Sequence, residues 1–194
     1  ISPTLSAIEV LNFSDLATAD TISIAGANIT GATSVNLMAG VNNTANAFQV
    51  TGLPNIVNAS ITGNSEDFEI VFAPAATSGT ADAMTLALSN STDGTFADRS
   101  EVRISAGSTN AIESLTVNSI GSANRLNRLT QTPVAGTAGT SLATLNITGD
   151  QNLAIGAMRD VGTIAAGVTV GQLDNSITTI NAGAFTGSLA GSEG

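Results

Sequence analysis

The densest group of side chains able to do chemistry is acidic and surrounds a glycine. Asp93 and Asp98 flank Gly94, and Glu101 follows three residues after Asp98. Several carboxylate oxygens gathered in one loop are what a calcium ion requires, at about 2.4 Å. The alternative is a solvated turn in which Arg99 neutralises one carboxylate. The segment therefore offers Asp93, Asp98 and Glu101 as candidate calcium ligands.

A second acidic run reads Glu66, Asp67, Phe68, Glu69. If Phe68 points inward on a strand, Asp67 and Glu69 share the opposite face, because side chains alternate along a strand. That face would bind a cation, and Glu66 and Asp67 are the candidate metal ligands of this run. The alternative is an exposed strand whose charges discourage edge pairing.

Two further acidic residues fall at turn positions. Asp150 follows Gly149, and Asp174 precedes the apolar run that begins at Ile177. Stacked turns can share an ion, so both residues are candidate metal ligands. The alternative has equal weight, because Asp favours turns through side-chain to backbone hydrogen bonds.

One pair of basic residues is spaced for anion recognition. Arg125 and Arg128 lie three apart, and guanidinium groups bind carboxylates and phosphates through paired hydrogen bonds. A sugar carboxylate or a lipopolysaccharide phosphate would suit them. The alternative is a loop in which both arginines form salt bridges with neighbouring acids.

Most other catalytic chemistry is excluded by composition. The 194 residues include no His, Cys, Trp, Tyr or Lys. Imidazole and thiolate are needed for the common nucleophilic triads and for ordinary zinc sites. We therefore expect that the protein is not an enzyme. A polysaccharide-active enzyme built on paired carboxylates stays open as an alternative.

Charge narrows the choice of partners. The formal net charge is −10 with only five basic residues, whereas nucleic acids and anionic lipids are bound through clustered cations. We expect neither partner, and calcium is the expected cofactor because oxygen ligands dominate. No apolar run approaches the roughly 20 residues of a membrane-spanning helix. A start at Ile1, without an initiator Met or a signal peptide, is expected for a piece of a longer chain.

The elements that must position these residues are short strands. Gly, Asn, Ser and Thr separate runs of alternating apolar residues throughout the chain. Short helical turns are expected only at residues 14–18, and residues 152–159 read as a loop or turn. One pattern recurs at Ile112, Leu142 and Ile177, with spacings of 30 and 35 residues, which is typical of stacked repeats.

These patterns predict an all-β protein with a parallel β-helix or β-solenoid in its second half. Spacing drifts in the first half, which predicts either an irregular solenoid or a β-sandwich-like module. We divide the chain into an N-terminal β-rich module, residues 1–75, and a solenoid-like repeat module, residues 76–194. Pro74 to Thr80 is the expected loop between them.

The order and composition of residues 80–190 resemble those of a known family. Ser141 to Ile155 and Ile177 to Leu189 resemble repeats of alphaproteobacterial S-layer and RTX-type exoproteins. The resemblance implies β-solenoid modules, type I secretion and calcium-controlled assembly on the cell surface. The chain departs from the family in lacking the Gly- and Asp-rich nonapeptides that bind calcium in RTX repeats.

The resemblance and the composition together predict a secreted structural protein of a bacterial surface layer. It would form a lattice with copies of itself, through lateral contacts and bound calcium, and would contact surface polysaccharide or lipopolysaccharide. An adhesin module of an RTX-type exoprotein is the first alternative, and the polysaccharide-active enzyme is the second.

Overall fold

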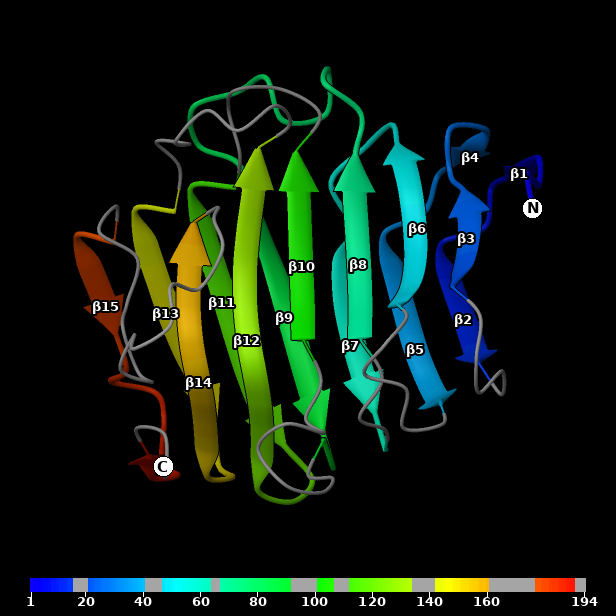
Figure 1. Cartoon of the computed structure of the whole chain (residues 1–194). Helices are drawn as coiled ribbons and strands as arrows, with labels where there is room; N and C mark the ends of the chain where they lie inside the picture. Colours follow the sequence, from blue (N-terminus) through cyan, green and yellow to red (C-terminus); the bar gives the residue numbers. More distant parts are fainter. Residues whose placement is uncertain are drawn as a thin grey trace, which may run out of the picture.

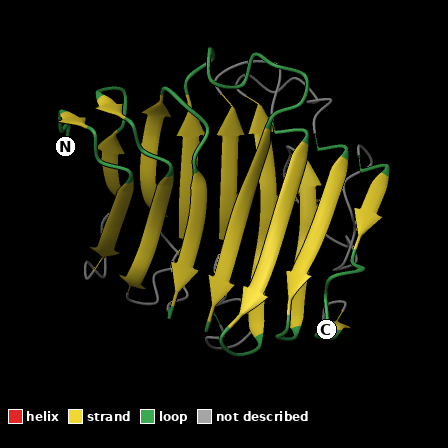
Figure 2. Cartoon of the chain, turned by 180° about the vertical axis from the view of Figure 1, so that it is seen from behind, coloured by secondary structure: helices red, strands yellow, loops and turns green. Residues whose placement is uncertain are grey.

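The computed structural model describes residues 1–15, 21–40, 47–63, 67–91, 101–106, 112–133, 142–160 and 177–190. Within these ranges the chain is all-β and alternates between two seven-stranded parallel sheets that face each other (Figures 1 and 2). The result is a β-solenoid. Among the described residues, there is no helix long and apolar enough to cross a membrane.

Sheet 1 and sheet 2 take alternate strands of the chain. Sheet 1 consists of β2 (Val10–Asp15), β5 (Ser34–Gly40), β7 (Asn58–Thr62), β9 (Ala83–Ser89), β11 (Ser114–Ile120), β13 (Thr144–Gly149) and β15 (Thr179–Asn181). Sheet 2 consists of β3 (Ile22–Ala25), β6 (Ala47–Leu53), β8 (Asp67–Phe72), β10 (Glu101–Ala106), β12 (Asn124–Pro133), β14 (Leu153–Asp160) and β16 (Leu189–Ala190). A small third sheet pairs β1 (Leu5–Ser6) with β4 (Ile29–Thr30).

The core lies between the two sheets and is built from columns of apolar side chains. In sheet 1 one column runs through Val35, Ala59, Leu86, Val117 and Ile147, all of them buried. Small branched side chains suit this arrangement because equivalent residues on neighbouring parallel strands lie about 4.8 Å apart.

Aromatic side chains fill the first part of the core. Phe13 of sheet 1 meets Phe48 of sheet 2 with ring centroids 5.1 Å apart. Phe48 in turn lies 6.1 Å from Phe68 on the next strand of sheet 2. Tilted ring pairs at these distances contribute beyond their buried area. The first pair therefore ties the two sheets together, and the second links neighbouring strands of sheet 2.

The repeat predicted in the second half is confirmed by the strand register. Ser114 pairs with Thr144, which pairs with Thr179. The three repeat starts at residues 112, 142 and 177 lie two residues before these partners. They are therefore stacked equivalents.

The first half is an irregular solenoid, not a sandwich. Its strands pair in parallel from β2 onward, whereas the Greek-key sandwich requires antiparallel pairs. The register shifts by one residue between Phe13 and Ser14 and again between Thr51 and Leu53. The repeat length drifts mainly because the segments between paired strands differ in length, as Ala47 pairs with Asp67 but Phe68 pairs with Val102. Both sheets continue past residue 75, since β7 pairs with β9 and β8 pairs with β10.

The structure contains one of the loops predicted from the sequence and differs from the prediction in two other segments. Pro74 to Thr80 is a loop, as expected. Residues 152–159, expected as a loop or turn, instead form most of β14. Of the helical turn expected at residues 14–18, Ser14 and Asp15 lie in β2, and residues 16–18 lie outside the described residues. In both places pairing with a neighbouring parallel strand overrides the local turn propensity.

The corners between the sheets depend on left-handed backbone and on buried asparagine. Asn90 and Gly121 have positive φ values of 59° and 80° just after β9 and β11, a conformation that Gly and Asn tolerate best. The buried Asn124 side chain accepts from the Ser91 N–H at 2.9 Å and donates to Ser119 Oγ at 2.8 Å. The Asn124 side chain thus joins the corner after β9 to the corner after β11 by hydrogen bonds.

Candidate functional site

The candidate functional site is a ladder of charged side chains on the outer face of sheet 2. Alternation along β8 buries Phe68 and turns Asp67 and Glu69 outward, as the sequence predicts. Parallel pairing places Glu69 beside Arg103 of β10, and Glu101 of β10 beside Arg128 of β12. We call Asp67, Glu69, Glu101, Arg103 and Arg128 the charged ladder.

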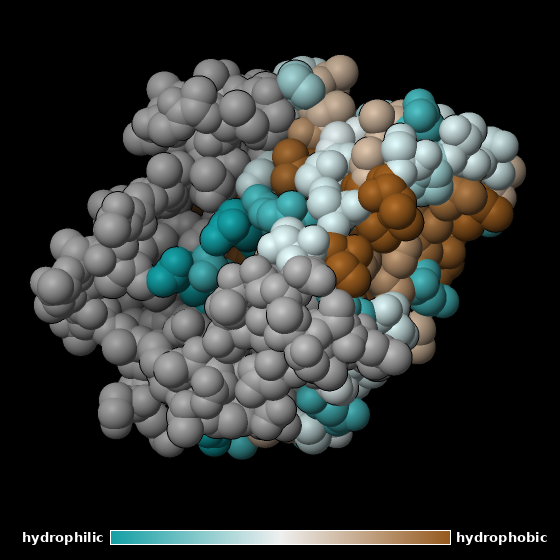
Figure 3. Space-filling view, turned by 45° about the vertical axis from the view of Figure 1, so that its right-hand side comes forward, coloured by the Kyte–Doolittle hydropathy of each residue, from teal (hydrophilic) through white to brown (hydrophobic). Residues whose placement is uncertain are grey.

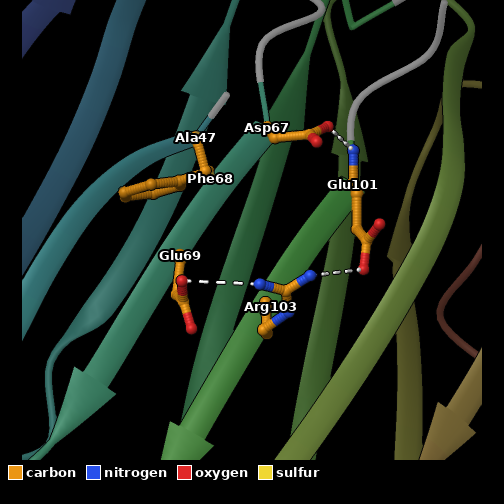
Figure 4. Close-up of a pocket in the computed structure, with 6 residues that line it drawn as sticks. All are labelled: Ala47, Asp67, Phe68, Glu69, Glu101 and Arg103. Atoms are coloured by element: carbon orange, nitrogen blue, oxygen red, sulfur yellow. Dashed lines mark hydrogen bonds and ion pairs between the residues drawn. The ribbon is translucent and has the colours of Figure 1, made fainter. Parts of the chain in front are cut away.

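Arg103 links two of the carboxylates in this ladder. Its Nη1 lies 3.5 Å from Glu69 Oε2 and its Nη2 lies 3.2 Å from Glu101 Oε1 (Figure 4). Arg128 Nη1 reaches the same Glu101 carboxylate at 3.3 Å. Glu101 is therefore held between two guanidinium groups, and its side chain is only 14% exposed.

Glu69 has neutral partners as well. Gln49 of β6 donates from Nε2 to Glu69 Oε2 at 2.7 Å. Ser105 donates from Oγ to Glu69 Oε1 at 3.4 Å. Both oxygens of this carboxylate are thus engaged by side chains of neighbouring strands.

Asp67 is the acid whose ionisation the site perturbs most. Its Oδ1 accepts the backbone N–H of Glu101 at 2.7 Å. Burial is the largest cause that raises the pKa of Asp67, from 3.8 to about 6, and the nearby Glu101 charge raises it further. The hydrogen bond from Glu101 and the charges of Arg103 and Arg128 oppose that rise without cancelling it.

A shallow pocket opens between β6, β8 and β10 beside this ladder. Its lining is drawn in Figure 4 and comprises Ala47, Asp67, Phe68, Glu69, Glu101 and Arg103. Chemically it offers one acid that exchanges a proton near pH 6 and one guanidinium that is partly accessible, with 40% of the Arg103 side chain exposed.

In this pocket two of the three carboxylates face arginine, and metal binding by Asp67 and Glu101 stays a prediction. Calcium takes six to eight oxygen ligands, and the carboxylates of Glu69 and Glu101 are already paired with arginine. Where the structure describes the chain, no three acidic side chains gather into a metal-binding group.

The structure brings together three of the residues singled out from the sequence. Asp67 and Glu101, predicted as metal ligands, meet at the starts of β8 and β10, and Arg128 joins them from β12. The predicted partner Arg125 is exposed on the same strand as Arg128, and the arginine pair lies on this strand, not in the expected loop. Asp150 is exposed in the turn after β13.

Four other candidate ligands lie outside the described residues, namely Glu66, Asp93, Asp98 and Asp174. Metal binding by these residues stays a prediction. Conversely, the site uses Arg103 and Gln49, which the sequence reasoning did not single out. Arg103 stands between the buried Val102 and Ile104, so strand alternation was a sufficient signal that it faces outward, whereas its place beside β8 depends on the register.

The outer face of sheet 1 carries a different, uncharged ladder. Asn36 donates from Nδ2 to Asn12 Oδ1 at 2.8 Å, and Ser60 Oγ donates to Asn36 Oδ1 at 2.8 Å. Further along the same face, Asn181 donates from Nδ2 to Asn146 Oδ1 at 2.9 Å. We call these outward Asn, Ser and Thr side chains of sheet 1 the amide ladder.

The chain was compared with protein-family models, with curated proteins and with solved structures. None of the three comparisons finds a match.

Proposed function

We propose that this chain is a structural module of a bacterial surface layer that assembles with copies of itself. The proposal rests on one observation, namely that the outward polar side chains of both sheets are held in place by their neighbours. Side chains of the charged ladder and of the amide ladder bond to neighbours on adjacent strands. Such faces lose little conformational entropy when another molecule covers them, which suits repeated lateral contacts.

The location and export of the protein belong to the same proposal. The resemblance to S-layer and RTX-type exoproteins supports secretion by a type I system and residence on the outer cell surface. A parallel β-solenoid is compatible with that class of protein. It is also a fold in which each rung contacts only its neighbours, so length can be adjusted to span a layer.

Calcium enters the proposal through loops and not through the charged ladder. Glu69 and Glu101 already face arginines, so the ligands would be the loop and turn residues Glu66, Asp93, Asp98, Asp150 and Asp174. A bound ion would neutralise carboxylates that repel one another at a net charge of −10. It would thereby order the loops and bridge adjacent copies.

An adhesin is the second candidate function, and one residue favours it. Arg125 is exposed on β12, three residues before Arg128, and a surface polysaccharide carboxylate or a lipopolysaccharide phosphate can approach its guanidinium. A glycan array would show binding that Arg125→Ala abolishes if the adhesin function holds.

The proposed lattice function is tested by assembly with and without calcium. Light scattering and electron microscopy should show sheets or filaments in calcium chloride, and chelator should disperse them and lower the melting temperature. The double variant Asp93→Asn, Asp98→Asn should behave like the chelated protein. Glu9→Gln, an exposed acid outside the proposed loops, is the control.

Two results would count against these ideas separately. Assembly that proceeds equally in chelator removes calcium from the proposal and leaves the structural role. A protein that stays monomeric at all calcium and protein concentrations contradicts the structural role itself.

A further inference from the structure

Two large apolar side chains are exposed on interior strands of sheet 1. Met38 of β5 is 48% exposed and Ile120 of β11 is 39% exposed. The other exposed large apolar side chains of the described residues lie toward the two ends of the strand stack, and Figure 3 shows the hydrophobic surface on the N-terminal side. These others are Ile1, Ile8, Val10, Ile180 and Leu189. Strands that continued the solenoid at either end would leave Met38 and Ile120 uncovered.

Met38 and Ile120 lie on one line across the outer face of sheet 1. Ile120 pairs in register with Ser89, and Ser89 pairs with Thr62. Met38 stands on the same line, because the residues that directly precede it and Thr62 are paired. Neighbouring strands lie about 4.8 Å apart, so the three steps from β5 to β11 separate the two apolar side chains by about 14 Å.

The rest of this face is polar but uncharged. The strands β5, β7, β9, β11, β13 and β15 contain no charged residue, and Asp15, the only one in β2, is buried. The outer face of sheet 2 carries the charged ladder instead, and ion pairs lose hydration when they are covered. Of the two faces, sheet 1 is therefore the one on which a second copy can lie without burying charge.

We propose that two copies of this chain pair face to face through the outer face of sheet 1. The inference rests on the proposed structural function and names one of its lateral contacts. A twofold axis that runs parallel to the strands, between β7 and β9, lays β5 of each copy over β11 of the other. Met38 of each copy then covers Ile120 of the partner subunit, so both apolar side chains leave water. Such a contact is isologous and closes as a dimer.

The remaining side chains and the size of the face also suit a second copy. Asn, Ser and Thr side chains both donate and accept hydrogen bonds, so the amide ladder of one copy offers partners to that of the other. The six strands from β2 to β13 overlap, and each has five to seven residues. They form a face about 29 Å by about 20 Å, so the pair buries about 1,200 Å², the lower limit for specific interfaces. We therefore expect a dimer that dissociates on dilution.

Lysine substitutions at the two apolar positions test this surface. Met38→Lys and Ile120→Lys each place a charge where the second copy would cover it. Each should raise the dissociation constant of the dimer by about 100-fold, since a symmetric dimer carries the substitution twice. Ser23→Lys is the matched control, because Ser23 is exposed on β3 of sheet 2, and this variant should dimerise like the unmodified chain.

Sedimentation equilibrium in chelator measures these dissociation constants without any contribution from calcium, and circular dichroism checks that each variant is folded. Raising the salt concentration should strengthen the dimer of the unmodified chain, because salt screens the repulsion between two chains of net charge −10. A dimer that both variants, Met38→Lys and Ile120→Lys, retain would overturn the proposal.

Thiol cross-linking tests the arrangement, because the chain has no Cys of its own. Packed sheets lie about 10 Å apart, so a bismaleimide of about that span joins facing positions. A mixture of Met38→Cys and Ile120→Cys should give cross-linked dimers. Each variant alone should not, because like positions lie about 17 Å apart in the proposed dimer. Cross-linking of either variant alone that equals cross-linking of the mixture would contradict the proposed axis.

The outcomes also separate this inference from the proposed function. If the unmodified chain stays monomeric in chelator but forms sheets or filaments in calcium chloride, the face-to-face dimer is wrong and the structural role stands. If the dimer forms and the two lysine variants weaken it, but no larger assembly appears at any calcium concentration, the inference holds and the proposed surface layer is wrong.

Discussion

The two outer faces of the solenoid are both built on parallel strands, but their outward side chains find partners on adjacent strands in different ways. On sheet 1, an amide side chain can donate to one neighbouring strand and accept from the other, as Asn36 donates to Asn12 and accepts from Ser60. On sheet 2, charged residues need a partner of opposite sign or a neutral one, as in the series Gln49, Glu69, Arg103. Parallel in-register stacking favours identical amides and penalises identical charges.

Asp67 is the exception on the charged face, because it lies beside a residue of the same charge. Its neighbour in register is another acid, Glu101, and the charge of Glu101 is one of the causes that raise the pKa of Asp67. Burial is the larger cause. The amide ladder has no counterpart to this conflict, since the described outward side chains of sheet 1 include no charged group.

Removing the shared carboxylate should have the largest effect of any change on either face. Glu101→Gln leaves Arg103 and Arg128 facing each other without their common anion, in surroundings where Arg128 Nε is already buried without a partner. We expect the free energy of unfolding to fall by about 2 kcal/mol, below the cost for a fully buried pair because both arginines are partly exposed.

Urea unfolding at pH 7 measures this loss. The exposed acid Glu9 supplies the control through Glu9→Gln, which should change stability by less than about 0.5 kcal/mol. A Glu101→Gln variant as stable as the unmodified chain would mean that the charged ladder does not contribute to stability.

A smaller effect of opposite sign is expected at Asp67. The unfolded chain releases the Asp67 proton near pH 3.8 and the folded chain near pH 6. Between these values the folded state binds more protons, so stability falls as pH rises through this window. Asp67→Asn keeps an oxygen to accept the Glu101 N–H and should stabilise the protein at pH 7 by about 1 kcal/mol, after allowance for solvent screening.

Thermal melts at pH 4.5 and pH 7 test the sign. The difference between the two melting temperatures should be smaller for Asp67→Asn than for the unmodified chain. An identical pH dependence in both proteins would show that Asp67 titrates normally in the fold.

The amide ladder should give the smallest effect. Asn36→Ala removes hydrogen bonds to Asn12, Ser34 and Ser60, but these partners are partly exposed and can bond to water. We expect a loss of about 0.5–1 kcal/mol that does not change when salt is raised, whereas the Glu101→Gln loss should shrink in salt. Equal salt dependence of the two losses would erase the distinction between the faces.

Sequence patterns predict a strand where apolar and polar residues alternate strictly. They are insufficient where polar residues interrupt that alternation. Around Phe68 the sequence predicts the outward face of the strand because buried and outward residues alternate without interruption. By contrast, β6 was missed, since it contains Gly52 and a register shift beside it. The segment containing β12 was read as a loop because Asn and Arg dominate it, although its Leu126 and Leu129 are buried.

In the candidate site, too, only part of the arrangement could be predicted from the sequence. That Asp67 and Glu69 face outward follows from the sequence. That Arg103 joins them does not, because the partners are 34 residues apart and the pairing depends on how many residues the intervening corners and loops contain. The residues predicted to bind calcium in loops stay predictions, since residues 92–100 and 161–176 lie outside the described ranges.

The sequence by itself determined which side chains of a strand face the core and which face outward, because a strand turns successive side chains to opposite faces whatever its neighbours are. It also determined the repeat at Ile112, Leu142 and Ile177, since stacked columns require apolar residues at equivalent positions. Only the tertiary structure decided register, and with it which charges meet. In a parallel solenoid every lateral contact spans a whole rung, so neighbours such as Glu101 and Arg128 are fixed by the path of the chain between them.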